Sequence, residues 1–304
     1  MISVLIPTYN DETHLPFAIA SALQTDGVSE IIIVDDYSQD QTKKLIKELK
    51  KKSSKIKYHR NKKNLGSGIS YIKALERAKF PYVCMLNSDD FFIPTGVSNL
   101  LKFLINNDLE IAYGKMAIKK NDEIFKFNHP GYWDQNYSNL RDEFKDLQIF
   151  DMYIPSFGTI IKRDIINVFY SQNYYERLMN DYGDEFKAHD YDLIINLAKK
   201  KKKIGFINEF VCVWCPKKDS QSAANYFLTG EAAYESAFLY NRYCDSRMFD
   251  YQTRCKIFKR INEKFENADE NSKRSYSHLS KHYETFLKNI NLKHSDVSSV
   301  GREV

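Results

Sequence analysis

Glycine and proline are scarce in this sequence, whose 304 residues include 11 Gly and 7 Pro. This scarcity argues against a disordered low-complexity chain and against a turn-rich all-β protein. Apolar residues make up 43% of the chain, and 21 Tyr and 20 Phe add large side chains, which is ample for a hydrophobic core. The length is that of one large domain, or of a domain with an appendage.

Long apolar runs are also missing. No segment approaches the roughly 20 apolar residues that a membrane-spanning helix needs, and the N-terminus enters a predicted strand at once, without the pattern of a signal peptide. The five cysteines are odd in number and scattered, which is typical of a reducing compartment. Cys212 and Cys215 have redox or half-zinc spacing, but no second Cys/His pair lies nearby, so we interpret them as structural. We therefore expect a cytoplasmic protein.

Acidic residues are almost absent from one stretch of the chain. Between Lys43 and Lys63 there are eleven Lys or Arg and one Glu, and a second basic block runs from Lys199 to Lys203. One interpretation is contact with an anionic lipid surface, a glycan or nucleic acid. The other is the solvated face of a helix. Apolar residues recur at helical spacing among the lysines, which favours the second interpretation.

Three short apolar runs in the first 90 residues are each followed by polar and acidic residues. Nearly continuous apolar runs are typical of strands buried on both faces of a parallel sheet. Ligands bind beyond the carboxyl ends of such strands, so we expect one polar crevice there. Residues 2–6 lead into Pro7-Thr8-Tyr9-Asn10, residues 31–34 into Asp35-Asp36-Tyr37-Ser38-Gln39-Asp40, and residues 82–86 into Asn87-Ser88-Asp89-Asp90.

Helical patterns separate these runs, and the resulting βαβαβαβ order implies a parallel sheet with right-handed crossovers. We expect helices at 15–24, from Ser38 or Asp40 to about 52, and at 69–79, 94–106 and 190–200, with further strands at 56–59, 111–115, 159–162 and 205–214. Residues 128–153 are polar and aromatic without clean periodicity, which predicts a long loop.

The pattern changes to helices alone after residue 223. Two groups of apolar residues each share one helical face: Ile257, Phe258, Ile261 and Phe265, and then Tyr276, Leu279, Tyr283, Phe286 and Ile290. We predict a helical appendage over residues 223–304. Its two apolar faces suggest self-association into a homo-oligomer, or contact with the acceptor or another partner.

Three motifs follow one another along the chain: Val4-Leu-Ile-Pro-Thr-Tyr-Asn10, Ile33-Val-Asp-Asp-Tyr-Ser-Gln-Asp40 and Leu86-Asn-Ser-Asp-Asp90. In this order and spacing, they resemble the motifs of the inverting glycosyltransferases of family 2. The resemblance covers residues 1–222. It implies a GT-A type, Rossmann-like and mostly parallel sheet flanked by helices, to which the helical appendage is added. No family is assigned to residues 223–304.

The resemblance implies a donor site at the carboxyl ends of the strands. Tyr9 can present its aromatic face to a uracil ring, and Asp36 can accept a hydrogen bond from the uracil N3–H, while Asp35 braces the loop. The donor-binding residues that it implies are Pro7, Thr8, Tyr9, Asp36, Asn64, Gly66, Ser88, Asp89 and Lys217. For Thr8 and Asn10, simple turn chemistry is an equal alternative.

The run Asn87-Ser88-Asp89-Asp90 stands where the family has its Asp-x-Asp motif. There a divalent cation, Mn²⁺ or Mg²⁺, joins protein carboxylates to the diphosphate of the donor. Asp89, Asp90 and Asn87 are the ligands that this implies. Asn87 replaces the usual first Asp, and Lys217 stands where a histidine is common. Both changes suggest a weakly bound cation.

The run His189-Asp190-Tyr191-Asp192-Leu193 resembles the family's Glu-Asp-x-x-Leu pattern at a helix start. The second acid of that pattern is the general base, so the resemblance assigns the catalytic role to Asp190. His189 replaces the usual first acid. It could lower the pKa of Asp190 if it were protonated, or it could contact the acceptor itself. The alternatives are that Asp190 only caps the helix or that Asp192 is the base.

The resemblance therefore predicts an inverting enzyme of polysaccharide biosynthesis that transfers a sugar from a nucleotide-sugar donor to a hydroxyl group. We expect the donor to be UDP-linked and the acceptor to be a glycan, a lipid-linked glycan or a protein. We expect no nucleic-acid partner, and a cytoplasmic location with peripheral contact at the inner face of the membrane. One alternative is a degenerate, non-catalytic nucleotide-sugar-binding scaffold, suggested by the substitutions at 87, 189, 215 and 217. Another is a sugar nucleotidyltransferase, which would need a Gly-rich, Arg-containing loop in place of Pro7-Thr-Tyr-Asn10.

Overall fold

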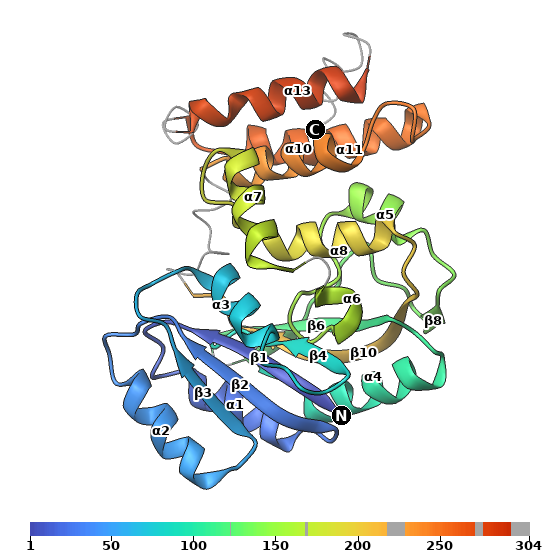
Figure 1. Cartoon of the computed structure of the whole chain (residues 1–304). Helices are drawn as coiled ribbons and strands as arrows, with labels where there is room; N and C mark the ends of the chain where they lie inside the picture. The colour runs from blue at the N-terminus through green and yellow to red at the C-terminus, as the bar shows by residue number, and fades with distance from the viewer. Residues whose placement is uncertain (122, 168–169, 218–228, 271–275, 293–304) are drawn as a thin grey trace. The chain divides into compact units, whose positions relative to one another are not determined.

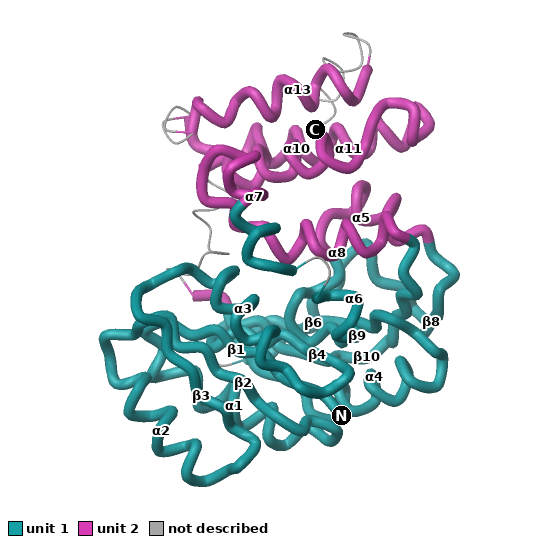
Figure 2. The backbone as a smooth tube through the Cα atoms, in the orientation of Figure 1, with its two compact units in different colours: residues 1–141, 153–176, 201–215 teal, residues 142–152, 177–200, 216–304 magenta. Residues whose placement is uncertain are grey.

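The computed structural model describes residues 1–121, 123–167, 170–217, 229–270 and 276–292, and Figure 1 shows its elements. The chain divides into two compact units (Figure 2). The first comprises residues 1–141, 153–176 and 201–215. The second comprises residues 142–152, 177–200 and 216–304. The predicted domain boundary after residue 222 lies outside the described residues and stays a prediction.

One mixed β-sheet forms the centre of the first unit. Among the described residues it has ten strands, in the order β3-β2-β1-β4-β9-β6-β10-β5, while β7 pairs with β6 and β8 pairs with β10. The strands are β1 (Ile2–Thr8), β2 (Val28–Asp35), β3 (Ile56–Arg60), β4 (Tyr82–Met85), β5 (Phe91–Phe92), β6 (Ile111–Lys120), β7 (Glu123–Lys126), β8 (Tyr137–Ser138), β9 (Ile160–Lys162) and β10 (Ile204–Trp214).

The half of the sheet that contains β1 to β4 is parallel, as the sequence predicted. All residues of β1 are buried, and its alternate side chains Ile2, Val4 and Ile6 belong to the main core cluster. Helices α1 (Leu15–Gln24) and α2 (Thr42–Lys52) lie on one face of the strands, and α3 (Ser67–Leu75) lies on the other (Figure 1). The carboxyl ends of β1, β2 and β4 therefore meet at one edge, because parallel strands end on the same side.

The α2 helix explains most of the basic stretch. Ile46 is fully buried, Leu45 and Leu49 pack against the core, and the intervening lysines are exposed. The interpretation as a solvated helix face is therefore confirmed for α2, although the end of the same stretch, Lys62 and Lys63, lies at a different place in the fold.

The other half of the sheet departs from the parallel pattern. Strand β9 runs antiparallel to both β4 and β6, while β6 and β10 are parallel. Helix α4 (Pro94–Asn106) packs on this part, with the predicted bounds, and α6 (Arg163–Asn167) follows β9. The β6 strand extends beyond the predicted 111–115 because it forms a hairpin with β7.

The second unit is helical. Its helices are α5 (Glu143–Phe150), α8 (His189–Lys199), α10 (Glu231–Tyr243), α11 (Tyr251–Glu266), the 3₁₀ helix η1 (Ser277–Leu279) and α13 (Ser280–Ile290), and α7 (Gln172–Tyr182) runs from the first unit into the second. The prediction of a long loop over 128–153 was wrong, because this stretch contains β8 and α5. Asp142 begins α5 by accepting a hydrogen bond from the N–H of Lys145 at 3.1 Å.

The two apolar faces predicted after residue 223 are buried within the second unit. Phe258 and Phe286 are fully buried, and their rings lie 6.3 Å apart and nearly parallel. Phe265 stacks on Tyr283 with ring centroids 4.5 Å apart. Intramolecular packing of the helices thus covers the surface that suggested self-association, and the homo-oligomer loses its supporting observation.

Within the described part of the chain, every helix is too short or too polar to cross a membrane.

Candidate active site

Asp36 follows β2 directly, and its side chain is buried. Its Oδ1 accepts hydrogen bonds from Nδ2 of Asn61 at 2.7 Å and from the N–H of Leu65 at 2.9 Å, and its Oδ2 accepts one from the N–H of Gly66 at 2.7 Å. A carboxylate has about four lone-pair positions. Three are used to hold the turn at residues 61–66 against the sheet, so one remains for a ligand.

Asn61 is a site residue that the sequence analysis missed. Its Nδ2 donates to Asp36 and also to Oγ of Ser70 at 3.0 Å, and its Oδ1 accepts from Nζ of Lys73 at 2.9 Å. The side chain therefore joins β3, α3 and the acidic end of β2. No periodic pattern marks such a residue, because its partners come from three separate segments.

The turn that contacts Asp36 depends on Gly66. This residue has φ 87° and ψ 161°, a conformation that side-chain-bearing residues rarely adopt. Its N–H points at both Oδ2 of Asp36 and Oδ1 of Asn64, at 2.7 and 3.1 Å. Asn64 and Gly66 thus shape the turn beside Asp36, and their donor-binding role stays a prediction.

Asp35 braces the loop after β2, as the sequence predicted. Its carboxylate accepts hydrogen bonds from the N–H of Ser38 and the hydroxyl of Tyr58, both at 2.8 Å, and pairs with Nε of Arg60 at 3.0 Å. Burial, and then the neighbouring Asp35, raise the pKa of Tyr58, so its hydroxyl stays protonated and donates. Tyr58 and Arg60 of β3 therefore hold the loop that carries Asp36 in place through their contacts with Asp35.

The end of β1 presents two different groups. Pro7 and Thr8 are buried, and the Thr8 hydroxyl has no hydrogen-bond partner among the described residues. Tyr9 is 47% exposed, so its ring is open to a planar ligand. The Thr8 carbonyl accepts a hydrogen bond from the N–H of Asp36 at 2.8 Å, which places the two strand ends side by side. A buried hydroxyl without a partner costs free energy that a bound ligand would recover.

Turn chemistry accounts for Asn10. Its Oδ1 accepts a hydrogen bond from the N–H of Gln39 at 2.7 Å, and its own N–H donates to Oγ of Ser38 at 2.9 Å. Its φ of 48° is one that Asn tolerates better than most residues. Asn10 therefore joins the loops after β1 and β2.

The cluster after β4 is tied together internally. Nδ2 of Asn87 donates to Oδ2 of Asp90 at 2.7 Å, and Oδ1 of Asn87 accepts from the Tyr71 hydroxyl at 2.5 Å. Oδ1 of the buried Asp90 accepts from the N–H of Cys215 at 2.8 Å, which connects the cluster to the end of β10. Asn87 and Asp90 therefore have structural partners that the sequence did not reveal.

Ser88 and Asp89 are half-buried members of the same cluster. Oγ of Ser88 donates to Oδ2 of Asp11 at 2.7 Å. Asp11, which the sequence analysis did not select, is buried, and its other oxygen lies 2.7 Å from Nδ1 of His14. The carboxylates after β1 and β4 thus share one edge of the sheet.

These residues fit a divalent cation only in part. In the described part of the chain, no group of three or more His, Cys, Asp or Glu side chains could hold a metal ion. The amide of Asn87 and the carboxylate of Asp90 already form hydrogen bonds with each other, and they also accept hydrogen bonds from Tyr71 and Cys215, respectively. The described side chains therefore fit a divalent cation only in part, and the role of Asp89 as a ligand stays a prediction.

The predicted base, Asp190, belongs to the second unit. It is half-buried in the first turn of α8, where its Oδ1 accepts a hydrogen bond from the N–H of Tyr191 at 2.8 Å. Its other oxygen has no hydrogen-bond partner within the part of the chain that the structure describes. Asp192, by contrast, is fully buried and accepts from the Tyr243 hydroxyl at 2.7 Å, which gives it a structural role.

The start of α8 is capped from another helix. The N–H groups of Lys187 and Ala188 donate to the two oxygens of Glu235 at 2.7 and 2.9 Å. Capping of this end therefore does not depend on Asp190 alone. Burial lowers the pKa of His189, against the opposing effect of Asp190, so this histidine is neutral at pH 7. In its neutral form His189 adds no positive charge beside Asp190.

Lys217 is also a residue of the second unit and is half-buried. It follows the end of β10 by three residues. The later residues of the same motif, Ser220 and Ser222, lie outside the described residues, and the donor-binding role of Lys217 stays a prediction.

Comparison with known proteins agrees with the motifs. The family model of Glycosyl transferase family 2 matches residues 3–169. An uncharacterized glycosyltransferase of Methanocaldococcus jannaschii is 25% identical over 231 residues, which make up 72% of this chain and 72% of that protein.

Two relatives carry names that state an activity. The UDP-Glc:alpha-D-GlcNAc-diphosphoundecaprenol beta-1,3-glucosyltransferase WfgD of Escherichia coli is 30% identical over 125 residues, 41% of this chain and 49% of that enzyme. The GalNAc(5)-diNAcBac-PP-undecaprenol beta-1,3-glucosyltransferase of Campylobacter jejuni is 25% identical over 203 residues, 66% of this chain and 60% of that enzyme. The match thus spans about half of the first enzyme and three fifths of the second.

Among solved structures, residues 1–349 of S. aureus TarS in complex with UDP-GlcNAc align with a TM-score of 0.68. The alignment covers 95% of this chain and 81% of that chain at 16% identity. At this identity the likeness shows a shared fold.

Proposed function

The chain belongs to glycosyltransferase family 2 and has a GT-A fold, and on that premise we propose that it is an inverting enzyme that moves a sugar from a UDP-linked donor to a hydroxyl group of a lipid-linked glycan. The acceptor class is supported by the E. coli and C. jejuni relatives, whose names give undecaprenol-diphosphate glycans as substrates. A membrane-bound acceptor agrees with a cytoplasmic enzyme that works at the inner face of the membrane.

The single observation that supports the donor most strongly is the set of unsatisfied polar groups where β1 and β2 end. The buried Thr8 hydroxyl lacks a partner among the described residues, the Tyr9 ring is half exposed, and Asp36 keeps one lone-pair position. A uracil ring could stack on Tyr9 and donate its N3–H to Asp36. A nucleotide base with a hydrogen-bond acceptor in place of the uracil N3–H would place a lone pair against the carboxylate of Asp36, and no hydrogen bond could form.

Inversion requires one base and one displacement. In the proposed mechanism Asp190 removes the proton from the acceptor hydroxyl while that oxygen attacks the anomeric carbon. The bond from that carbon to the diphosphate breaks on the opposite side, its electron pair leaves with UDP, and the configuration at the carbon inverts. The oxygen of Asp190 without a described partner is suited to accept the proton. Neutral His189 can orient a hydroxyl by hydrogen bonding.

A divalent cation, when bound, would neutralise charge on the departing diphosphate. In this proposal Asp89 would be a ligand of the cation, because it stands at the position of the family's Asp-x-Asp motif. Lys217 supplies a fixed positive charge for the same diphosphate in this proposal.

Replacement of the base tests the proposal. Asp190→Asn should keep UDP affinity and reduce transfer to a diphosphoundecaprenol-linked acceptor by about 10²–10⁴-fold. Asp181→Asn is the matched control, because Asp181 is an exposed acid of the same unit, 59% accessible, with a weak pairing to Arg242 at 3.4 Å. NMR of the product should show an anomeric configuration opposite to that of the donor, and the released nucleotide should be UDP.

Near-normal transfer by Asp190→Asn would remove Asp190 as the base. Release of pyrophosphate instead of UDP would indicate a nucleotidyltransferase. UDP-sugar binding without turnover on any acceptor would indicate a scaffold.

A further inference from the structure

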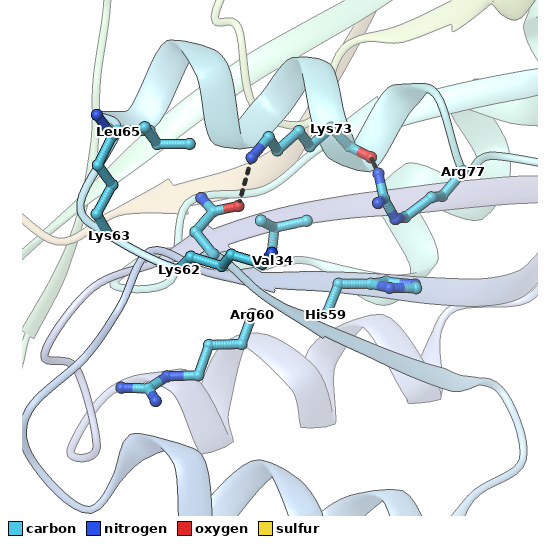
Figure 3. A pocket seen from close by; sticks show the side chains of 9 residues that line it. Val34, His59, Arg60, Lys62, Lys63, Leu65, Lys73 and Arg77 are labelled. Atoms are coloured by element: carbon cyan, nitrogen blue, oxygen red, sulfur yellow. Dashed lines mark hydrogen bonds between the residues drawn. The ribbon is translucent and has the colours of Figure 1, made fainter.

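A basic pocket of about 440 Å³ lies between the end of β3 and helix α3 in the first unit (Figure 3). This volume falls in the range of small-molecule sites. Of its nine described lining residues, five are Lys or Arg and none is Asp or Glu. The lining residues are Val34, His59, Arg60, Asn61, Lys62, Lys63, Leu65, Lys73 and Arg77.

Most of this positive charge is not matched by a carboxylate. Arg60 is the exception, because it pairs with Asp35, and Figure 3 shows it directed away from the other cations. Lys73 donates to the neutral amide oxygen of Asn61, and Arg77 donates to the carbonyl of Lys73 at 2.6 Å. The contact of Arg77 with Glu76 is 3.9 Å long and exposed, so it contributes little.

The remaining cations approach the pocket from two sides. Lys62 and Lys63 come from the turn after β3 and are exposed, while Lys73 and Arg77 come from α3 and the residues just after it. Neither Lys62 nor Lys63 has an ion pair with another described residue. Burial lowers the pKa of His59, and Arg77 and then Lys50 lower it further, as expected where positive potential accumulates.

We propose that this pocket binds a phosphate group that is attached to a small organic moiety. The three ammonium groups of Lys62, Lys63 and Lys73 and the guanidinium of Arg77 match the charge and the acceptor oxygens of a phosphate. Val34 and Leu65 add apolar wall for the organic part. The source is either a soluble phosphate ester or the headgroup of an anionic phospholipid, which share this chemistry.

The pocket adjoins the proposed donor site at the turn of residues 61–66, because Asn61 and Leu65 line the pocket and also donate hydrogen bonds to Asp36. Asn61 faces Lys73 through its amide oxygen and Asp36 through its amide nitrogen. The proposal does not depend on glycosyl transfer, because phosphate binding is measured without a donor or an acceptor.

The test uses the full chain and three probes. Inorganic phosphate and glycerol 3-phosphate are titrated by calorimetry, and vesicles of phosphatidylcholine with or without phosphatidylglycerol are used for co-sedimentation. The imidazole resonances of His59, assigned with His59→Gln, report binding at this place. The variant is Lys62→Gln with Arg77→Gln, and the matched control is Lys43→Gln with Lys47→Gln, which removes the same charge from the exposed face of α2.

We expect a His59 shift on addition of phosphate ester, and at least about tenfold weaker binding in the pocket variant than in the control, which corresponds to ~1.4 kcal/mol. Binding that is confined to phosphatidylglycerol vesicles and lost only in the pocket variant assigns the lipid headgroup. No binding of any probe, or an equal loss in both variants, would overturn the proposal, because the second result is that of a diffuse surface charge.

Discussion

Asp36→Asn is the most informative substitution, because the structure gives Asp36 two separable roles. The carboxylate holds the turn at 61–66 through three hydrogen bonds of 2.7 to 2.9 Å, and its last lone-pair position is proposed to receive the uracil N3–H. Asn keeps the shape of the side chain but replaces one oxygen by an NH₂ group. That group will face an N–H donor, either of the turn or of the ligand.

The magnitude follows from the hydrogen bonds that the substitution removes. One charged hydrogen bond to the turn contributes about 1.5–3 kcal/mol, and we expect the free energy of unfolding in urea to fall by that amount. UDP should lose a charged acceptor of the same kind, which weakens its affinity roughly 10- to 100-fold. Calorimetry measures the second effect on protein that circular dichroism shows to be folded.

Two further variants separate the roles. Asn61→Ala removes one donor to Asp36 but leaves the carboxylate, so it should destabilise the fold while weakening UDP less than Asp36→Asn does. Asp40→Asn is the control on the same loop, since Asp40 accepts hydrogen bonds from Glu12 and Thr42 instead of the turn. Unchanged UDP affinity in folded Asp36→Asn would refute the base-pocket assignment.

Three other expectations follow from the structure. A chain shortened to residue 222 loses Glu235, which caps α8, and Arg260, which pairs with Asp151 at 2.6 Å. It should therefore aggregate, or unfold without cooperativity in calorimetric scans. A soluble protein that unfolds cooperatively would contradict this expectation. Burial lowers the pKa of His189 and of His282 in the folded state, so the unfolded chain binds protons at these residues at a higher pH than the folded chain does. The free energy of unfolding should therefore fall as the pH drops through about 6.5. In urea titrations at pH 7 and pH 5, His282→Gln should make this fall smaller. Because Asn87 and Asp90 are engaged with each other, part of the transfer activity should persist in EDTA. The Asn87→Asp variant should bind Mn²⁺ more tightly. Complete loss of activity in EDTA, restored at micromolar metal, would show that the protein binds the metal more strongly than proposed.

Local sequence patterns were enough to predict strands β1 to β4, their parallel direction and the edge at which the polar residues gather. An apolar run that ends in Asp35-Asp36 or Asn87-Ser88-Asp89-Asp90 is visible within one segment, so no remote contact is needed to recognise it. The bounds of α4 and the apolar faces of α11 and α13 were predictable for the same reason. The mixed direction of β9, the β6–β7 hairpin and helix α5 were not predicted.

The partners of the polar residues, in contrast, are set by the packing of remote segments. Asp36 meets Gly66, 30 positions away, and Asp90 meets Cys215, 125 positions away. Asn61 and Glu235 carry no motif and become important only through such contacts. The C-terminal apolar faces likewise resemble an interface in the sequence, but in the folded chain the helices bury one another's faces. Hydropathy records whether a side chain prefers burial, but a hydrogen bond also needs a direction and a distance, which only the folded chain provides.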